Sequence, residues 1–506
     1  MSRRILSSAA VTLLLLAASS CSRSSEAALR RTAILPVENL TGDSSVDWIG
    51  TAASSILTNQ TRSAVGSNIF AVPALREAYA RNAERVVHGY ATYANPSRPG
   101  KDLKLSFVIE DLATKKTQPA VELQGNVLDA LNRFAHTLVP NAGTFSTANV
   151  DAMTAWASGD FSKAVELDPN FGQAWLSLLR KQAFARDMPG AQQTAERALA
   201  QKSLRNEYDR LEITGLLAEL RKDYRGRAQA YEALAALTPS DMTAAIAAAQ
   251  AQTLARNFQA AAALYRKVVA AEPANFGAMN SLGYAEAMAG NLDGSKRAFE
   301  TYAKQPGQAV NAIDSLGEAH FMNGKFREAA SFFQQAFTRD PKFAEGQTLV
   351  KAAYAQWLAG DLPGADKLFS QYSSQHADNA AALVEASWLY STGREEQARA
   401  ELASAPPILQ AAVQRQLALW NSVKESVRQP PSAAQLLQRK DAYESTMPPK
   451  DAETRTFYAF ALAASGRLDD ARALVQQWPL PTVSSDPFSA SLVFPQFIAT
   501  RRKTGL

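Results

Sequence analysis

Small and bulky apolar positions recur with a nearly constant period through the middle of the chain. Turns are expected at Lys222, Arg256, Gly290, Gly324, Gly360 and Gly393. The first four are 34 residues apart, and the last two follow after 36 and 33 residues. Five positions after each turn stands a mostly small residue: Arg227, Ala261, Ser295, Ala329, Ala365 and Ala398. Four positions further, most units have a bulky apolar residue: Tyr231, Tyr265, Phe299, Phe333 and Phe369. Self-similarity of this length predicts helix pairs that bury their apolar faces by stacking on their neighbours.

The unit at residues 309–342 shows why each position holds its residue type. Gly317 and Ala329 are small, which lets the two helices of the unit cross closely. Gly324 can adopt the left-handed conformation that ends the first helix. Pro341 ends the second helix because it has no N–H to donate. We expect Phe333 to fill the gap between this unit and the next.

The array extends beyond its regular units. We expect repeats over 147–405, with an atypical first unit whose second helix is two turns shorter and ends near Asp168. After about residue 405 the period weakens, and 406–475 is expected to hold divergent helical repeats. Residues 476–506 include Trp478, Phe494 and Phe497. They are interpreted as a tail that either caps the last repeat or docks a partner.

Residues 32–140 alternate between strand and helix patterns. Short apolar or alternating runs predict strands at 32–37, 68–72, 85–93, 103–110 and 120–123. Apolar stripes with helical spacing predict helices at 46–61, 74–83 and 127–138. Intermixed strands and helices indicate a small α/β or α+β domain. His88 lies in a strand pattern with no second ligand or nucleophile beside it, so we expect it to be structural.

The amino-terminal segment, up to Arg31, has the pattern of an export signal. Arg3 and Arg4 precede an uncharged apolar run at 5–18, which is shorter than the about 20 residues of a membrane span. The segment Ala18-Ser19-Ser20-Cys21 resembles a bacterial lipobox, with alanine where leucine is usual. The resemblance implies a signal peptide at 1–20, lipidation of Cys21 and a tether at 21–31. A plain signal with an incidental cysteine is the alternative.

Composition excludes several classes of protein. Apolar residues make up 46% and charged residues 20% of the 506 residues, which is ordinary for a folded soluble protein. The net charge of +5 falls to +3 if residues 1–20 are removed, and 32–140 has ten basic and ten acidic residues. We therefore expect no nucleic-acid binding. Cys21 is the only cysteine, which excludes disulfide frameworks and cysteine-based zinc sites.

No pattern of catalytic residues stands out in the sequence. It contains no phosphate-binding glycine-rich loop, no Gly-x-Ser-x-Gly elbow, no His-Glu-x-x-His motif and no acidic calcium loop. We therefore expect a protein that is not an enzyme and that has no cofactor and no metal site.

The repeat unit resembles the tetratricopeptide repeat (TPR). Leu316-Gly317, Gly324, Ala329, Phe333, Ala336 and Pro341 hold that family's positions. The resemblance implies a mainly α fold, a TPR-type α-solenoid of antiparallel helix pairs preceded by the small α/β domain. In this family the first helix of each unit lines a concave groove. The corresponding residues here are Asp209, Glu212, Leu216, Glu219, Asn280, Tyr284, Asn311, Asp314, Glu318, Phe321, Gln347, Tyr354, Trp357 and Tyr390.

A second resemblance covers the start of the α/β domain. Residues 33–43, Ala-Ile-Leu-Pro-Val-Glu-Asn-Leu-Thr-Gly-Asp, resemble the opening of the TolB amino-terminal-like domain, which has Phe where Val37 stands. That domain often precedes tetratricopeptide repeats in bacterial regulators and is generally non-catalytic. Related regulators carry a cyclase or kinase domain ahead of it, whereas the expected signal and tether stand in that place here.

Together these observations predict a non-catalytic lipoprotein of the cell envelope. We expect a lipid anchor in the outer membrane, facing the periplasm, by analogy with lipoproteins that lack aspartate after the cysteine. The groove would bind protein partners through an extended or helical peptide segment, because aromatic and acidic side chains suit apolar and basic anchors. The alternative is a periplasmic sensor that binds a small ligand or a glycan through the TolB-like domain.

Overall fold

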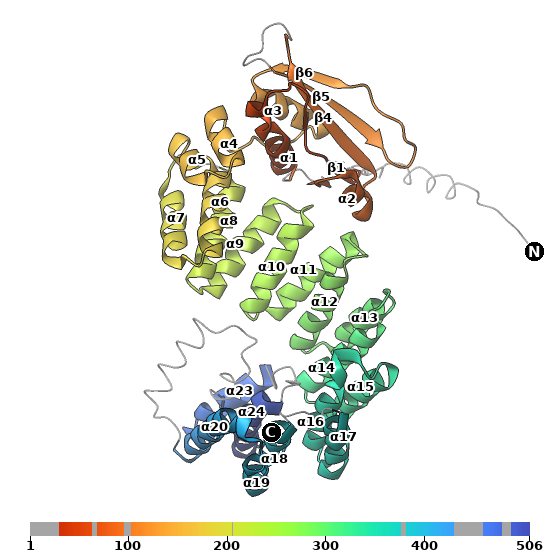
Figure 1. The fold of residues 1–506 in the computed structure, drawn as a ribbon, viewed down its shortest axis with the longest axis vertical. Helices are drawn as coiled ribbons and strands as arrows, with labels where there is room; N and C mark the ends of the chain where they lie inside the picture. The colour runs from red at the N-terminus through yellow and green to blue at the C-terminus, as the bar shows by residue number, and fades with distance from the viewer. Residues whose placement is uncertain are drawn as a thin grey trace, which may run out of the picture. The chain divides into compact units, whose positions relative to one another are not determined.

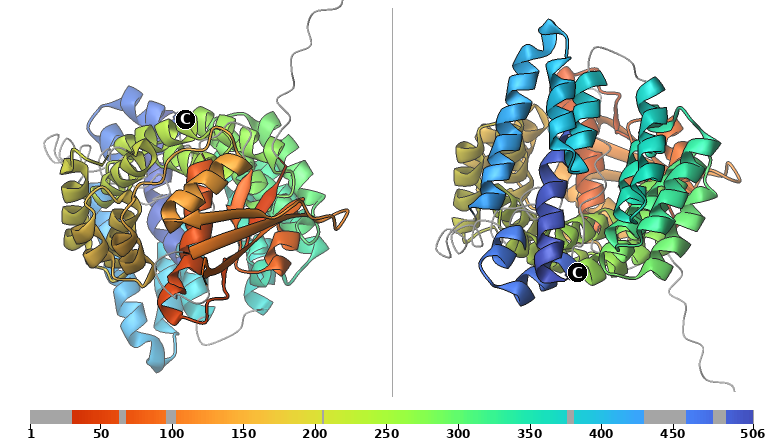
Figure 2. Two further views of the ribbon diagram at one scale, coloured as in Figure 1. Left: turned by 90° about the horizontal axis from the view of Figure 1, so that it is seen from above. Right: turned by 90° about the horizontal axis from the view of Figure 1, so that it is seen from below.

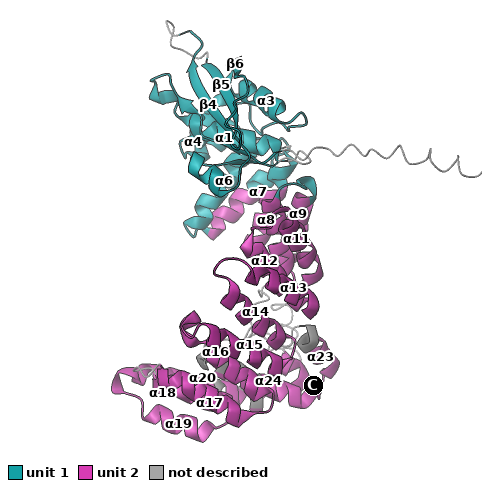
Figure 3. Ribbon diagram, turned by 90° about the vertical axis from the view of Figure 1, so that its right-hand side faces the viewer, with its two compact units in different colours: residues 1–187, 197–210, 236–241 teal, residues 188–196, 211–235, 242–506 magenta. Residues whose placement is uncertain are grey.

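The computed structural model (Figure 1) describes residues 30–62, 68–95, 103–204, 206–375, 381–429, 459–477 and 487–505. The chain divides into two compact units, shown in Figure 3. Unit 1 comprises residues 1–187, 197–210 and 236–241, and unit 2 comprises 188–196, 211–235 and 242–506. The predicted signal peptide and Cys21 lie outside the described residues.

Unit 1 begins with a six-stranded sheet. Its strands are β1 (Thr32–Ile34), β2 (Glu38–Asn39), β3 (Ile69–Ala71), β4 (Arg85–Tyr93), β5 (Leu103–Asp111) and β6 (Val121–Gly125). The main path is β3-β1-β4-β5-β6, with β2 pairing β4. β1 runs parallel to β3 and β4, whereas β4–β5 and β5–β6 are antiparallel. The five predicted strands are confirmed. β2 was not predicted, because a two-residue strand has no hydrophobic pattern.

The core of the α/β domain lies between the sheet and two helices. The domain's helices are η1 (Ser44–Val46), α1 (Trp48–Thr61), α2 (Leu75–Ala80) and α3 (Val127–Leu138), as predicted apart from the short η1 turn ahead of α1. Alternate residues of β5, including Leu105 and Phe107, are buried, and the Phe107 ring stacks on Phe134 of α3 with centroids 3.9 Å apart. His88 Nε2 lies 3.2 Å from Glu110 Oε2 across the β4–β5 pair, which fits its expected structural role.

Helix pairs follow the sheet domain along the chain. They are α4 (Val150–Ala157) with α5 (Phe161–Leu167), α6 (Gly172–Phe184) with α7 (Met188–Ala200), α8 (Glu207–Leu220) with α9 (Tyr224–Leu237), α10 (Met242–Leu254) with α11 (Phe258–Ala271), α12 (Phe276–Met288) with α13 (Leu292–Ala303), α14 (Ala309–Met322) with α15 (Phe326–Arg339), α16 (Thr348–Leu358) with α17 (Leu362–Gln375), and α18 (Ala381–Ser391) with α19 (Glu395–Ala403). The fold is therefore mainly α, a TPR-type array of helix pairs preceded by a small sheet domain.

The six predicted turn positions, and three more turns of the same kind, lie in the left-handed region. Positive φ occurs at Gly159, Arg186, Lys222, Arg256, Gly290, Gly324, Gly360, Gly393 and Gly466. An L residue pays about 1–2 kcal/mol to adopt this conformation, so glycine is favoured there. Lys222, with φ of 57°, adopts it without that advantage.

Glycines within the first helices make room for aromatic rings of the second. A Cβ on Gly283 would lie 2.5 Å from the Phe299 ring, and one on Gly317 would lie 2.5 Å from the Phe333 ring. Phe333 also joins a cluster with Leu349 of the next unit. The expected gap-filling role of Phe333 is confirmed, and Gly317 is small because of that ring within its own unit.

The longer spacing between Gly324 and Gly360 has a local cause. The turn η2 (Phe343–Gly346) separates α15 from α16, and Ala344, Glu345 and Gly346 all have positive φ. These left-handed residues accommodate the longer connection between the units without shifting the helical pattern on either side.

The last described segments complete unit 2. They are η3 (Pro407–Leu409), α20 (Gln410–Arg428), α23 (Leu468–Gln477) and α24 (Pro487–Thr504). Figure 2 shows α24 beside α18 and α20, which it contacts. The buried side chains described on α24 are three or four residues apart and form one face: Ser491, Phe494, Phe497, Thr500 and Thr504. The tail thus packs on the chain's own helices.

Candidate binding groove

A groove of about 580 Å³ lies on unit 2. Most of its lining comes from α10, α12 and α14, which are the first helices of three successive pairs. Its residues are Arg227, Gln250, Thr253, Leu254, Tyr265, Asn280, Ser281, Tyr284, Met288, Glu318 and Met322. We call this surface the open groove. It includes three of the predicted site residues, Asn280, Tyr284 and Glu318.

The 34-residue repeat places two rows of residues along the open groove. One row is Gln250, Tyr284 and Glu318, and the other is Leu254, Met288 and Met322. The second row was not predicted, although its equal spacing in the sequence was a signal that could have found it. Methionine side chains are flexible and polarizable, so this row can adapt to different apolar groups.

Asn280 lines the open groove and carries an unpaired acceptor beneath its surface. Its side-chain Oδ1 is buried and accepts no hydrogen bond from any residue that the structure describes. Leaving such a buried acceptor unpaired costs about 1–3 kcal/mol. A peptide N–H is a donor of the required kind, and it would reach this buried atom once the Asn280 side chain turned toward the groove.

A charged network lies at the α14 side of the open groove. The hydroxyl of Tyr284 donates to Glu318 Oε2 at 2.7 Å and lies 3.1 Å from the hydroxyl of Ser315, which can donate to it. Lys351 Nζ, from α16, donates to Glu318 Oε1 at 2.5 Å and to Asp314 Oδ2 at 2.7 Å. The side chains of Lys351 and Asp314 are only 11% and 7% exposed.

Burial and charge set the protonation of this network. Burial first, and the negative charge of Glu318 second, raise the pKa of Tyr284 well above its usual value. Burial also raises the pKa of Asp314, although the ammonium of Lys351 opposes the shift. Burial alone would lower the pKa of Lys351, but Glu318 and Asp314 outweigh it and raise that pKa. The lysine is therefore held charged between two carboxyl groups, a poor arrangement for a nucleophile.

The sequence did not predict Lys351 as a residue of this network. It stands inside the apolar run Leu349-Val350-Lys351-Ala352-Ala353, and a lysine at a buried position is rare unless it is paired. That mismatch was the available signal. Its partners come from another unit, 33 and 37 residues away, which the local pattern does not reveal.

The open groove carries opposite charges on its first and last helices. Arg227 of α9 forms an ion pair with Glu219, with 3.4 Å between Nη2 and Oε2. Its guanidinium carbon is 5.6 Å from the Tyr231 ring centroid. Glu318 of α14 lines the other end, and its carboxylate already accepts from Tyr284 and from Lys351. A segment with an acidic group toward α9 would complement Arg227.

Four predicted groove aromatics lie elsewhere. Phe321 and Tyr354 have no exposed surface, and Tyr390 is 7% exposed. Trp357 is half-buried, with its ring centroid 5.4 Å from that of Phe494. The expectation that these side chains form an open surface is therefore corrected, because other helices of the chain cover them.

The contacts that cover three of these aromatics come from distant parts of the chain. The Tyr354 ring stacks on Phe494 of α24 with centroids 4.8 Å apart and meets Trp388 at 5.0 Å. Tyr390 stacks on Trp420 of α20 at 4.1 Å. We call the surface under α24 the covered surface; it consists of Tyr354, Trp357, Trp388, Gln416 and Trp420.

The remaining predicted residues do not line the open groove. Asp314 lies in the charged network behind it. Asn311 donates to Tyr302 Oη at 3.0 Å, and Gln347 precedes the first turn of α16. On α8, Asp209 is fully buried and accepts from Gln173 at 2.5 Å, while Glu212 and Leu216 stand apart from the groove lining.

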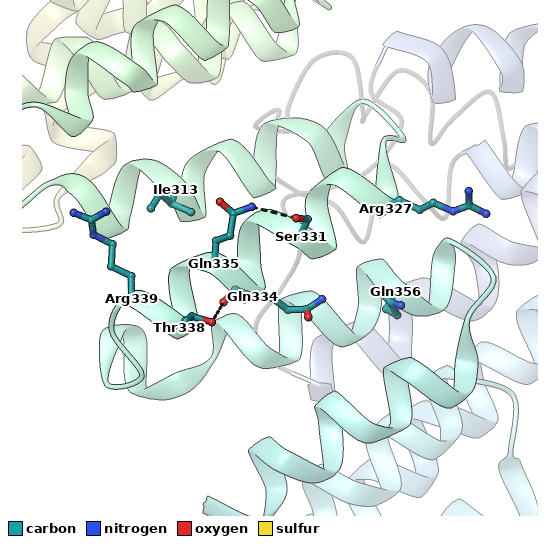
Figure 4. A pocket seen from close by; sticks show the side chains of 8 residues that line it. All are labelled: Ile313, Arg327, Ser331, Gln334, Gln335, Thr338, Arg339 and Gln356. Atoms are coloured by element: carbon teal, nitrogen blue, oxygen red, sulfur yellow. Dashed lines mark hydrogen bonds between the residues drawn. The ribbon is translucent and has the colours of Figure 1, made fainter.

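A second hollow of about 550 Å³ lies along α15. Figure 4 shows its lining, which is Ile313, Arg327, Ser331, Gln334, Gln335, Thr338, Arg339 and Gln356. Arg327 and Arg339 point away from each other in this view. Gln335 donates to Ser331 Oγ at 3.1 Å on the same helix. Because most of the lining comes from one helix and no charged groups converge, this hollow lacks the repeat-spaced rows of the open groove.

Two features are absent from the part of the chain that the structure describes. Within it, no group of three or more histidine, cysteine, aspartate and glutamate side chains is arranged to hold a metal ion. No helix in the same part of the chain has both the length and the apolar character needed to cross a membrane.

Comparison with known proteins gives only distant structural similarity. No family model and no curated protein matches the chain. Among solved structures, the MamA protein is 16% identical (TM-score 0.29), covering 34% of this chain and 94% of its own. YrrB, described as a TPR protein with an unusual peptide-binding site, is 14% identical (TM-score 0.32), covering 39% and 97%. PilW, a type IV pilus biogenesis factor, is 18% identical (TM-score 0.31), covering 39% and 94%.

Proposed function

We propose that this chain is a non-catalytic scaffold of the cell envelope that binds a protein partner through the open groove. The observation that carries the proposal is the pair of repeat-spaced rows, Gln250–Tyr284–Glu318 and Leu254–Met288–Met322, running along one groove. Equivalent side chains at a constant spacing suit a ligand that is itself a chain, because it can meet the same contacts in successive units.

The chemistry of the groove favours a peptide segment, extended or helical. The row of Leu254, Met288 and Met322 offers apolar contacts to anchoring side chains. The unpaired Oδ1 of Asn280, now buried beneath the groove surface, would accept from a backbone or side-chain N–H once the side chain turned toward the groove. Arg227 at one end of the groove and the paired Glu318 at the other make the two ends differ, which would fix the direction in which the segment binds.

The location we propose rests on the amino-terminal segment up to Arg31. The short apolar run and Cys21 support a lipid anchor. Several acyl chains contribute about 0.8 kcal/mol per buried CH₂ and together give stable anchoring. The repeat array would then face the periplasm from the outer membrane and gather protein partners there, without a cofactor.

Site-specific photo-crosslinking tests the function. The photoreactive residue p-benzoylphenylalanine replaces either Gln250, in the open groove, or Gln335, in the hollow of Figure 4; both positions are exposed glutamines on helices. We expect Gln250 to yield a recurrent crosslinked protein in intact cells, attached through one peptide segment, and Gln335 to yield none. Equal products from both positions, or none from Gln250, would contradict the proposal.

A further inference from the structure

The covered surface is rich in aromatic side chains that face a single helix. Tyr354, Trp357 and Trp388 come from α16 and α18, and Trp420 comes from α20. Phe494 of α24 meets two of these rings, with centroids 4.8 Å from Tyr354 and 5.4 Å from Trp357. Tryptophan and tyrosine dominate the energetics of protein interfaces, where they accept a partner's anchoring side chains.

The face of α24 combines apolar and hydrogen-bonding contacts. Phe494 and Phe497 join a buried hydrophobic cluster with Tyr354 and Trp388, and the buried Ser491, Thr500 and Thr504 carry hydroxyl groups. Ser491 Oγ accepts hydrogen bonds from Gln416 Nε2 at 3.2 Å and from Trp420 Nε1 at 3.0 Å. Two aromatic anchors within a hydrogen-bonded surround are typical of binding interfaces.

Helix α24 also lacks one of its backbone hydrogen bonds. Pro495 lies inside the helix, where it has no N–H to donate to the carbonyl of Ser491 and its ring crowds that carbonyl. The helix is therefore weak by itself and depends on the surface that it covers.

We propose that the covered surface is a helix-binding site that α24 occupies within the chain, and that a partner competes for it with an amphipathic helix of the same face. That face has a small hydroxyl residue, then phenylalanines three and six positions later, as in Ser491, Phe494 and Phe497. The site differs from the open groove, so the proposal holds whether or not the open groove binds a partner.

A cleavable chain tests the proposal. A protease site is inserted after Pro481, between α23 and α24, and the purified protein is cut. A fluorescent peptide of residues 487–506 is then added, and its binding is followed by anisotropy. We expect the labelled peptide to exchange into the site, and the cut protein freed of α24 to keep its helical circular dichroism and its cooperative unfolding.

Variants of the peptide and of the protein define the contacts. The Phe494→Ala peptide should compete about 100-fold more weakly than the unchanged peptide, because it loses a buried ring. The matched Arg502→Ala peptide should compete equally, because Arg502 is exposed. In the protein, Trp357→Ala should weaken binding while leaving the fold intact, because Trp357 is only half-buried.

Three results would overturn the proposal. The first is loss of the cooperative transition when α24 is removed, which would make α24 part of the folding core. The second is failure of the labelled peptide to exchange. The third is equal competition by the Phe494→Ala and Arg502→Ala peptides.

Discussion

Equivalent positions of the repeat are exposed in one part of unit 2 and buried in another. Gln250, Tyr284 and Glu318 follow one another at 34-residue spacing and line the open groove. Tyr354 holds the same position in the next unit once the longer connection before α16 is counted. It is fully buried beneath α24.

The difference teaches that the repeat alone does not decide which part of its surface is available. The same helix face is open where no other described segment reaches it and closed where α24 packs. The groove side of the open stretch has mixed character, with methionines, an asparagine and a glutamate, whereas the covered stretch is mostly aromatic. The predictions below test this contrast, from the largest expected effect to the smallest.

Lys351 joins the two stretches, so its removal should have the largest effect. Lys351→Met leaves Asp314 and Glu318 as neighbouring buried carboxyl groups without their cation. We expect the free energy of unfolding at pH 7, measured with urea, to fall by about 3–5 kcal/mol. Lys367→Met, at an exposed position of α17, should change it by less than about 0.5 kcal/mol.

The stability of the Lys351→Met variant should change with pH in a defined direction. Burial raises the pKa of Asp314 in the folded protein, and the opposing ammonium is absent in the variant. The folded state therefore binds a proton more tightly than the unfolded state, and the variant should regain stability as the pH falls from 7 toward 4. A steady loss of stability over that range would contradict this account of the network.

Two glycines of α12 test the packing beneath the open groove. Gly283→Ala should destabilise the chain by about 1–3 kcal/mol, because its Cβ would lie 2.5 Å from the Phe299 ring. Gly277→Ala should instead stabilise it by about 0.5–1 kcal/mol, because its Cβ meets nothing closer than 3.7 Å and alanine favours the helix. Thermal unfolding of both variants checks the prediction, and equal shifts would refute it.

Substitution of Asn280 should affect partner binding without reducing stability. Asn280→Leu removes the unpaired buried acceptor, so the free energy of unfolding should stay the same or rise by up to about 1 kcal/mol. Crosslinking from position 250 should decrease in the same variant. A large loss of stability would show that Asn280 has a structural role, and unchanged crosslinking would remove it from the binding site.

Substitutions at the left-handed turns should have the smallest effect, and the turn residues line neither surface. Lys222→Gly should raise the free energy of unfolding by at most about 1 kcal/mol, because glycine adopts its φ of 57° without strain. Gly324→Ala should lower it by a similar amount, although open space surrounds that position. Chemical denaturation of both variants measures the pair; changes of the same sign would contradict the role of φ.

Local patterns in the sequence predicted local structure well. The turn positions from Lys222 to Gly393 have positive φ, and the strand runs from Thr32 to Leu123 form the sheet. These features depend on residues close together in the chain, where conformational preference and hydrophobic periodicity act directly.

Contacts between distant segments account for what the sequence did not reveal. Tyr354 and Trp357 have the spacing of groove residues, but Phe494, from the far carboxyl-terminal helix, covers them. Gln416 meets Ser491 across 75 residues. No period links α24 to α16 or α20, so only the folded chain shows that part of the expected groove is already occupied.

The most direct test of the contrast is intrachain photo-crosslinking in the purified protein. The probe p-benzoylphenylalanine is placed at Trp357 in one variant and at Gln250 in another, and mass spectrometry identifies the attached residues. The account predicts that the probe at 357 attaches to residues 487–504 of the same chain and that the probe at 250 does not. Attachment of the probe at 250 to that segment, or none from 357, would contradict the division into an open groove and a covered surface.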